Sequence, residues 1–273
     1  MSISRPDENY SIDFISNYDR FVDTSGIGED NQNWFTKIKT TVNRLQAKHY
    51  SKSPSFLSRL VAYIYTPAPR IGDRKTLLDF GCSTGNFLAH LPTTIQSVGI
   101  EINKSAVEIC RRRKLNVQQG DHRNLDKNKK YEIIRCCHVI EHIEDYRIFA
   151  SNISEILDKD GLLLIYTPNL ESLSRKIFGE DWEGYHESTH FNVFSKTALE
   201  KIFGEYGLKI NRWSTYPMGY SASSLVRKFK LDNKKIANAV TYILMLLIIP
   251  VDVLIAKLRM GDALYVEFVK SGG

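Results

Sequence analysis

The chain is poor in cysteine, and the few that it has are irregularly spaced. Its 273 residues include four, at Cys82, Cys110, Cys136 and Cys137. This number and spacing do not fit a disulfide framework, so we expect a reducing compartment. Residues 1–9 contain no apolar run of the kind that secretory signals carry. The expected location is therefore the cytoplasm.

A concentrated basic surface is also lacking. The net charge is +6 and the isoelectric point is near 9.0, but the excess is divided among residues 111–114, 127–130 and 227–235. None of these clusters alternates with aromatic residues in the way that nucleic-acid-binding surfaces do. We interpret the first two as solvated faces and expect no nucleic-acid partner.

Two common phosphate-binding patterns are missing. The chain has no Gly-x-Gly-x-x-Gly turn of the kind that holds a dinucleotide, and no lysine follows its glycine-rich turn as in a Walker-type loop. The glycine-rich turn that is present runs from Thr76 to Gly85 and reads TLLDFGCSTG, with Ser83 in place of a middle glycine. Its apolar run, acid and two glycines predict a buried parallel strand that turns sharply into a helix over residues 86–91. Gly81 and Gly85 lack a Cβ, so the backbone there can approach a ligand closely.

Strand and helix patterns then alternate along the chain. Strands are expected at residues 97–100, 115–118, 131–137, 162–167, 207–213 and 263–269, and helices at 105–114, 145–157 and 196–206. Ser195 is a natural N-cap for the last of these helices, and Asp160 and Gly161 are expected to form a turn. Repeated units of this length predict an α/β fold with a doubly wound, mainly parallel sheet. The last strand alternates as an edge or antiparallel strand does.

Polar residues stand at the ends of the predicted strands. They are Asp79, Glu101, Asp121, His138 and Asn169. In open α/β sheets the carboxyl ends of the strands form the edge where ligands bind. An acid at the end of the second strand can accept hydrogen bonds from both hydroxyls of a ribose.

The glycine turn resembles motif I of the class I S-adenosylmethionine-dependent methyltransferases. Two further segments strengthen the likeness: HVIEH at residues 138–142 is similar to the signature of ubiquinone-type and related small-molecule O-methyltransferases, and HFNVFS at 190–195 is similar to a segment of the same group. The resemblance covers about residues 76–269. It implies a Rossmann-like sheet of seven strands, with the last one antiparallel, and S-adenosylmethionine as cofactor. It also implies cofactor contacts at Asp79, Gly81, Cys82, Ser83, Gly85, Glu101, Ile102, Asp121, His122 and His138, with Glu101 on the ribose and Asp121 on the adenine amine.

The HVIEH segment also matches the His-x-x-Glu-His pattern of inverted zinc proteases. Two histidines four residues apart bind zinc together only when they share one face of a helix. Because residues 132–137 are predicted to be a strand, His138 stands at a strand end and His142 in the following turn. We therefore expect no metal.

Methyl transfer to a hydroxyl requires a group that takes up its proton, and histidine suits this role because its pKa lies near working pH. The candidates are His142 first and His190 second, with His186 as a helper. The expected acceptor is a hydroxyl of a small molecule or a cell-surface glycan, since no Asn-Pro-Pro-Tyr-type segment for base or amide methylation follows the fourth strand. A lipophilic acceptor such as a quinone or polyketide, and a non-catalytic assembly partner with this fold, are the alternatives.

Three other segments are predicted from their composition. Residues 1–75 are expected to form a lead-in and a helical cap beside a domain of residues 76–273. Residues 169–184, which include Phe178 and Trp182, are interpreted as a lid over the acceptor. An apolar helical insertion is expected at about 217–261.

The insertion contains an almost charge-free stretch, residues 236–251, preceded by several basic residues. Pro250 and Asp252 are expected to interrupt it, which makes it short for a membrane span. Basic residues beside an apolar helix suggest peripheral contact with an anionic membrane through residues 236–258. A homodimer interface and burial within the protein remain as alternatives.

Overall fold

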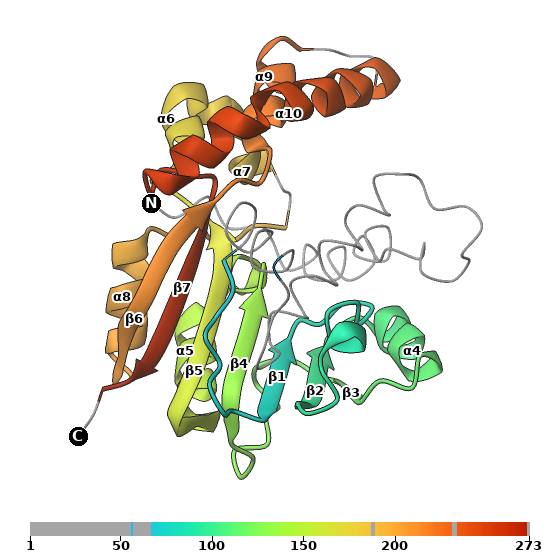
Figure 1. Cartoon of the computed structure of the whole chain (residues 1–273), viewed down its shortest axis with the longest axis vertical. Helices are drawn as coiled ribbons and strands as arrows, with labels where there is room; N and C mark the ends of the chain where they lie inside the picture. Colours follow the sequence, from blue (N-terminus) through green and yellow to red (C-terminus); the bar gives the residue numbers. More distant parts are fainter. Residues whose placement is uncertain (1–55, 57–66, 187–188, 231–233, 272–273) are drawn as a thin grey trace.

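The computed structural model describes residue 56 and residues 67–186, 189–230 and 234–271. Within these ranges a single sheet has the strand order β3-β2-β1-β4-β5-β7-β6 (Figure 1). The strands are β1 (Thr76–Phe80), β2 (Gln96–Glu101), β3 (Val117–Gln119), β4 (Tyr131–Cys137), β5 (Leu157–Pro168), β6 (Leu208–Tyr216) and β7 (Ala263–Lys270). Strands β1 to β5 pair in parallel, whereas β7 is antiparallel to both β5 and β6. This confirms the predicted fold class, including the antiparallel last strand.

Seven helices accompany the sheet in the described part of the chain. They are α4 (Lys104–Arg112), α5 (Tyr146–Ile156), α6 (Leu173–Phe178), α7 (Glu183–His186), α8 (Lys196–Gly204), α9 (Tyr220–Lys228) and α10 (Lys234–Lys257). Helices α5 and α8 pack on one face of the sheet, while α6, α9 and α10 gather beyond one end of it (Figure 1). Because β5 ends at Pro168, opposite the start of β7 and hence the end of β6, this is the carboxyl end of the parallel strands.

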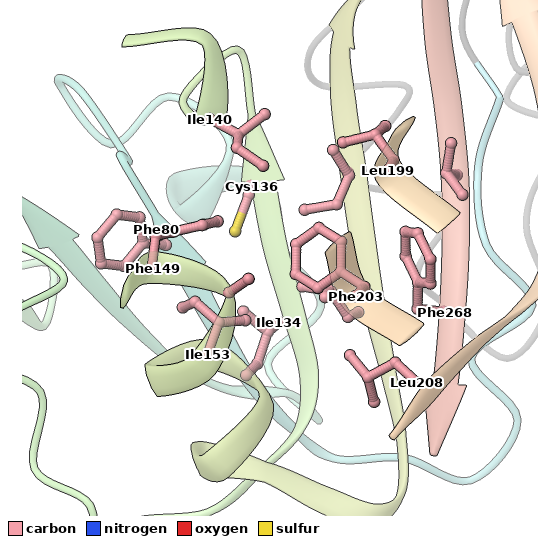
Figure 2. Close-up of a cluster of buried hydrophobic side chains, with 14 of the residues drawn as sticks. Phe80, Ile134, Cys136, Ile140, Phe149, Ile153, Leu199, Phe203, Leu208 and Phe268 are labelled. Carbon is pink, nitrogen blue, oxygen red and sulfur yellow. The ribbon is translucent and has the colours of Figure 1, made fainter. Parts of the chain in front are cut away.

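A hydrophobic core on the α5 and α8 face holds these layers together (Figure 2). Phe80 of β1 meets Phe149 of α5 with ring centroids 5.4 Å apart, and Phe203 of α8 meets Phe268 of β7 at 4.8 Å. Full burial of such a side chain stabilises the fold by about 1.5–3 kcal/mol. One hydrophobic core therefore covers this face of the sheet from its first strand, β1, to its last, β7.

The helix expected after the glycine turn is not formed. Only one 3-10 turn, η3 (Leu88–His90), follows Gly85. Leu91 adopts an extended conformation with ψ 147°, because a residue before proline is disfavoured in the helical region and Pro92 comes next. Asp160 and Gly161 also differ from expectation, since they lie within β5, beside a register irregularity, rather than in a turn before it. Ser195 does cap α8, as predicted, by accepting a hydrogen bond from the Ala198 amide at 3.0 Å.

The predicted lid segment is instead a packed helical layer. Trp182, between η5 (Gly179–Asp181) and α7, is fully buried. Its indole N–H donates to Ser174 Oγ at 3.0 Å, and its ring packs edge-on against Tyr185 and Tyr220 at centroid distances of 5.0 and 5.7 Å. Trp182 therefore joins α6, α7 and α9 within the segment that was expected to form the lid.

The apolar insertion forms α9 and α10, and α10 is one continuous helix of 24 residues. Pro250 and Asp252, which were expected to interrupt the charge-free stretch, both lie within this helix, since a proline removes one helical hydrogen bond without necessarily ending the helix. The predicted N-terminal cap lies outside the described residues, apart from residue 56 and residues 67–75.

Candidate functional site

A cavity of about 550 Å³ opens at the carboxyl ends of β1, β2 and β4. This volume lies within the range of about 300–1,000 Å³ that is usual for small-ligand pockets. Eight predicted site residues line it: Gly81, Ser83, Glu101, Ile102, Asp121, His122, His138 and His142. The rest of the lining is Phe80, Ile100, Gly120, Arg123, Cys137, Val139, Ile143, Glu144 and Phe191. Asp79, Cys82, Gly85 and His190 are not part of the lining, and the side chain of His186 lies outside the described set.

The glycine turn is held against the second strand by backbone hydrogen bonds. The Gly81 amide donates to the Ile100 carbonyl at 2.8 Å, and the Ser83 amide donates to Glu101 Oε2 at 2.7 Å. Ser83 has a left-handed backbone with φ 49°, which costs a residue other than glycine about 1–2 kcal/mol. The charge-assisted hydrogen bond to Glu101 offsets this cost. Ser83 can therefore occupy the place of the middle glycine.

Glu101 is buried at the centre of this arrangement. Its Oε1 accepts a hydrogen bond from the Asn103 amide at 2.9 Å, so each carboxylate oxygen has one backbone partner. Burial raises the pKa of Glu101, and the amides of Asn103, Ser83 and Ile102 oppose that rise. Each oxygen keeps a further lone pair, so the carboxylate can accept two more hydrogen bonds from neighbouring hydroxyls.

His122 carries a buried polar atom without a partner. Among the described side chains, its Nε2 is one of four buried polar atoms that lack a hydrogen bond, and His122 alone of those residues lines the cavity. Burial lowers the pKa of His122, as does the nearby positive charge of Arg123, so the imidazole is kept neutral. Asp121, by contrast, accepts from the Arg123 amide at 2.8 Å and pairs with its guanidinium at 3.3 Å. His122 therefore lines the cavity as a neutral side chain, and its ring packs edge-on against Phe149 of the core at a centroid distance of 6.0 Å.

Asp79 and Gly85 stabilise the glycine turn without lining the cavity. Asp79 is buried and accepts a hydrogen bond from Arg135 Nη1 at 2.7 Å, and the Arg135 guanidinium stacks 4.0 Å from the Phe87 ring centroid. A Cβ on Gly85 would lie 2.4 Å from Leu115 Cδ1. Gly85 is thus required for packing against the chain before β3, a role that the sequence pattern alone did not distinguish from ligand approach.

Cys82 is also part of this support. It belongs to the hydrophobic core on the opposite face from α5, and a Cβ on Gly99 would lie 2.6 Å from its sulfur. The neighbouring Cys110 thiol and, after it, burial raise the pKa of Cys82, so it is a neutral packing group.

His138 lines the cavity and pairs with two residues, Glu141 and Tyr216, that were not among the predicted site residues. It has a left-handed backbone with φ 55°, and its Nδ1 lies 2.9 Å from Glu141 Oε1. Its Nε2 lies 2.9 Å from the hydroxyl of Tyr216, at the end of β6, and Glu141 Oε2 accepts from Thr167 at 3.0 Å. Glu141 stands within HVIEH and was a visible candidate, but Tyr216 carried no sequence signal because its partner is remote in the chain.

The charge of Glu141 is maintained despite complete burial. Burial raises its pKa, but the hydrogen bond from His138 and the electrostatic interactions with His138, His142 and His190 outweigh this, and the net shift is downward. Its backbone carbonyl also accepts from the amides of Phe191 and Asn192, at 2.9 and 3.2 Å. Glu141 therefore holds the histidines and the loop beside them in one unit.

His142 and His190 are brought together from separate segments. Their ring centroids lie 4.8 Å apart. His142 Nδ1 lies 2.9 Å from the Thr189 carbonyl and His190 Nδ1 lies 3.0 Å from the Gly184 carbonyl. A carbonyl can only accept, so Nδ1 carries the proton in both rings and Nε2 is the basic nitrogen of a neutral ring. Of the two, His142 lines the cavity.

The zinc-protease arrangement is not formed. His138 directly follows β4, and η4 (Ile140–His142) is a single 3-10 turn, so His138 and His142 do not share a helix face. Ligand atoms of Glu141, His142 and His190 do lie within 4.8 Å of one another. Each carboxylate oxygen of Glu141 accepts one hydrogen bond, from His138 and from Thr167 respectively.

The sequence of the chain is similar to those of known proteins. Residues 47–212, more than half of the chain, match the model of a family described as a methyltransferase domain. The chain is 26% identical over 164 residues to a ubiquinone biosynthesis O-methyltransferase from Pelagibacter ubique, across 50% of this chain and 68% of that protein. It is 22% identical over 141 residues to (S)-tetrahydroprotoberberine N-methyltransferase from Eschscholzia californica, across 48% of this chain and 39% of that protein. It thus spans about 40–70% of the length of these relatives.

Solved structures share the fold at low sequence identity. Magnesium protoporphyrin IX methyltransferase from Synechocystis PCC 6803, with bound SAH, superposes with a TM-score of 0.56 at 16% identity, over 97% of this chain and 100% of that one. Mitomycin 7-O-methyltransferase superposes with a TM-score of 0.52 at 12% identity, over 85% and 54% of the respective chains. At these identities the likeness shows the fold alone. It agrees with the predicted seven-stranded arrangement.

Proposed function

The chain belongs to the methyltransferase domain family of class I S-adenosylmethionine-dependent enzymes, and we propose that it methylates a hydroxyl of a lipophilic small molecule. The methyltransferase activity and its cofactor follow from the family. The hydroxyl acceptor and its lipophilic character are supported by His142 and by the composition of the cavity lining.

The residues present fit the cofactor. Glu101 offers two carboxylate oxygens to a pair of ribose hydroxyls, and Ile102, Asp121 and His122 line the same cavity. The Gly81–Ser83 turn lies beside them. When bound, S-adenosylmethionine supplies a methyl group made electrophilic by the sulfonium that carries it.

His142 is the observation that carries the O-methylation proposal. A hydroxyl becomes a good nucleophile as it loses its proton, and a group poised for this task needs a basic atom at the cavity and a fixed orientation. The Thr189 carbonyl fixes the His142 ring through Nδ1, and the residue lines the cavity. His190 packs against this ring and orients it, and we assign it a positioning role.

The acceptor is assigned from the cavity lining. Val139, Ile143 and Phe191, which line the cavity together with His142, contribute apolar surface to it. Such a lining favours an aromatic or isoprenoid-bearing acceptor over a glycan. The ubiquinone O-methyltransferases among the relatives support a phenolic or quinol hydroxyl, whereas the alkaloid N-methyltransferases keep an amine acceptor as the second candidate.

The test is methyl transfer to matched phenolic, amine and sugar acceptors by the wild type and by His142→Ala. We expect transfer to the phenol, and a loss of about 10²–10⁴-fold in kcat in the variant. The affinity for S-adenosylmethionine, measured by calorimetry, should change little. His90→Ala, on η3, is the matched control and should keep full activity. Transfer to the amine alone, or an unchanged kcat in His142→Ala, would contradict the proposal.

A further inference from the structure

Helix α10 presents an apolar stripe to solvent. Six large apolar side chains are more than half exposed, five on α10 and one in the turn that follows it. They are Ile243, Leu246, Leu247, Val251, Leu254 and Leu258. They recur at intervals of three and four residues, so they lie on one side of the helix. The 18-residue window Val240–Lys257 has a mean hydropathy of 2.1, and 11% of it is buried. Among the helices that the structure describes, this is the one long and apolar enough to cross a membrane.

The other side of α10 is fastened to the protein. Asp252 is buried and accepts a hydrogen bond from Ser221 of α9 at 2.9 Å. The Ala256 carbonyl accepts from Thr215 of β6 at 2.8 Å. Nearer the start of the helix, Met245 packs on Gly219, where a Cβ would lie 2.4 Å from its methyl carbon. These contacts hold the helix along about three turns.

This attachment decides how α10 can meet a lipid bilayer. A helix of 24 residues is about 36 Å long, enough to span the hydrocarbon layer. A span would carry the Asp252–Ser221 pair and the adjoining end of β6 into the hydrocarbon, where unsatisfied polar groups are excluded. Lying in the plane of the interface, the helix buries only its exposed stripe and keeps its polar contacts within the protein.

The charges around the stripe favour an anionic surface. Exposed Lys228 and Lys230 flank Phe229, which is 71% exposed at the end of α9, and exposed Lys257 and Arg259 stand at the end of α10. From residue 234 to residue 261 the sequence has one acid, Asp252, and its side chain is buried. Exposed cations beside an apolar stripe complement anionic lipid headgroups.

The insertion and the cavity share one edge of the sheet. Tyr216 ends β6 and bonds His138 in the cavity lining, and α9 begins at Tyr220. Figure 1 shows α9 and α10 beyond this edge. We propose that α10 lies in the plane of an anionic membrane with its apolar stripe inserted. If the proposed lipophilic acceptor is correct, this docking places the cavity next to the phase in which the acceptor dissolves.

The experiment measures co-sedimentation of the full chain with vesicles. One vesicle type is phosphatidylcholine alone, and the other is an equal mixture of phosphatidylcholine and phosphatidylglycerol. We expect the wild type to bind the mixed vesicles more strongly, with a preference that declines as salt is added. Leu247→Glu should reduce this binding by at least about tenfold, because it places a charge on the inserted stripe. Lys228→Ser with Lys230→Ser should reduce the preference for anionic vesicles.

The matched control is Ile148→Glu, on α5. Ile148 is 48% exposed and lies on a helix that packs on the face of the sheet, so its change should leave vesicle binding unaltered. Sedimentation velocity without vesicles accompanies each variant.

Three outcomes would overturn the proposal. The wild type could fail to bind either vesicle, both glutamate variants could reduce binding equally, or the wild type could form a dimer that Leu247→Glu dissociates. The last outcome would identify the stripe as an interface between two copies. Methyl transfer to a water-soluble phenol by the same proteins separates this proposal from the enzymatic one, since docking can fail while that transfer continues.

Discussion

The two ends of the sheet's carboxyl edge differ in the groups that they present: fixed polar groups at one end and exposed apolar side chains at the other. At the β1–β2 end, the groups are fixed by backbone hydrogen bonds, as with Glu101 between the amides of Ser83 and Asn103. At the β6–β7 end, α10 leaves large apolar side chains in solvent. A polar ligand needs donors and acceptors held in place before it arrives, because reorienting them costs binding energy. An apolar partner needs only accessible surface and nearby charge.

The buried layer beneath the insertion separates the two ends. Trp182 of this layer contacts α7 through Tyr185 and α9 through Tyr220. Helix α9, which Trp182 contacts, in turn holds α10 through the hydrogen bond from Ser221 to Asp252. We therefore expect a substitution that weakens cofactor binding to leave the exposed stripe of α10 unaltered, and a substitution in the insertion to leave cofactor binding unaltered.

The largest effect is expected from Trp182→Ala. Removing a fully buried indole should lower the free energy of unfolding by about 3–5 kcal/mol, measured by denaturant titration. Trp213→Ala, at a partly exposed indole on β6, is the control and should cost clearly less. The folded variant should keep its affinity for S-adenosylmethionine. A parallel loss of affinity would show that the two ends are one cooperative unit.

Glu101→Ala should remove the cofactor site. Losing two hydrogen bonds to a charged acceptor costs about 3 kcal/mol or more, which is at least about a 100-fold loss of affinity. Calorimetric titration of S-adenosylmethionine measures it. Glu108→Ala, at an exposed acid on α4, should bind as the wild type does. Equal affinity in the two variants would exclude Glu101 from the site.

Cofactor affinity should depend on pH through Glu101. Burial raises its pKa above the usual 4.5, and only the ionised carboxylate accepts from both hydroxyls. Affinity should therefore be constant above this raised pKa and fall by up to about tenfold for each pH unit below it. Calorimetry across acidic pH measures the slope. Glu101→Gln should bind more weakly and show no such slope, and a slope retained in that variant would assign it to another group.

The smallest effect is expected at the insertion, from Asp252→Asn. Burial and nearby Asp262 raise the pKa of Asp252 from 3.8 to about 6. The folded state thus holds this proton to higher pH than the unfolded chain does, so stability falls as pH rises from about 4 to 6. After allowance for solvent screening, the loss is about 1–2 kcal/mol.

The asparagine variant should escape this loss and be more stable than the wild type at neutral pH, by thermal unfolding. Asp126→Asn, at an exposed loop position, is the control and should behave as the wild type does. An asparagine variant that is less stable at neutral pH would show that the negative charge is needed at this position.

Local patterns determined the elements that local energies govern. The apolar run before Asp79 predicted β1 because two buried leucines in succession suit a strand covered on both faces. Ser195 predicted the start of α8 because a serine side chain satisfies an otherwise unpaired amide. Glu101 and His138 could be proposed from strand ends, since the carboxyl ends of parallel strands share one edge.

Contacts between distant segments could not be read in this way. The partnership of His138 with Tyr216 joins residues 78 positions apart, and the burial of Trp182 depends on α9 arriving beside it. The side of α10 that faces water was equally undetermined, because the helix is apolar all round. Sequence by itself therefore determined the order of strands and helices, the family and the cofactor edge. Tertiary structure alone decided the partner of each buried polar group and the apolar surface left exposed, because both depend on which remote segments pack together.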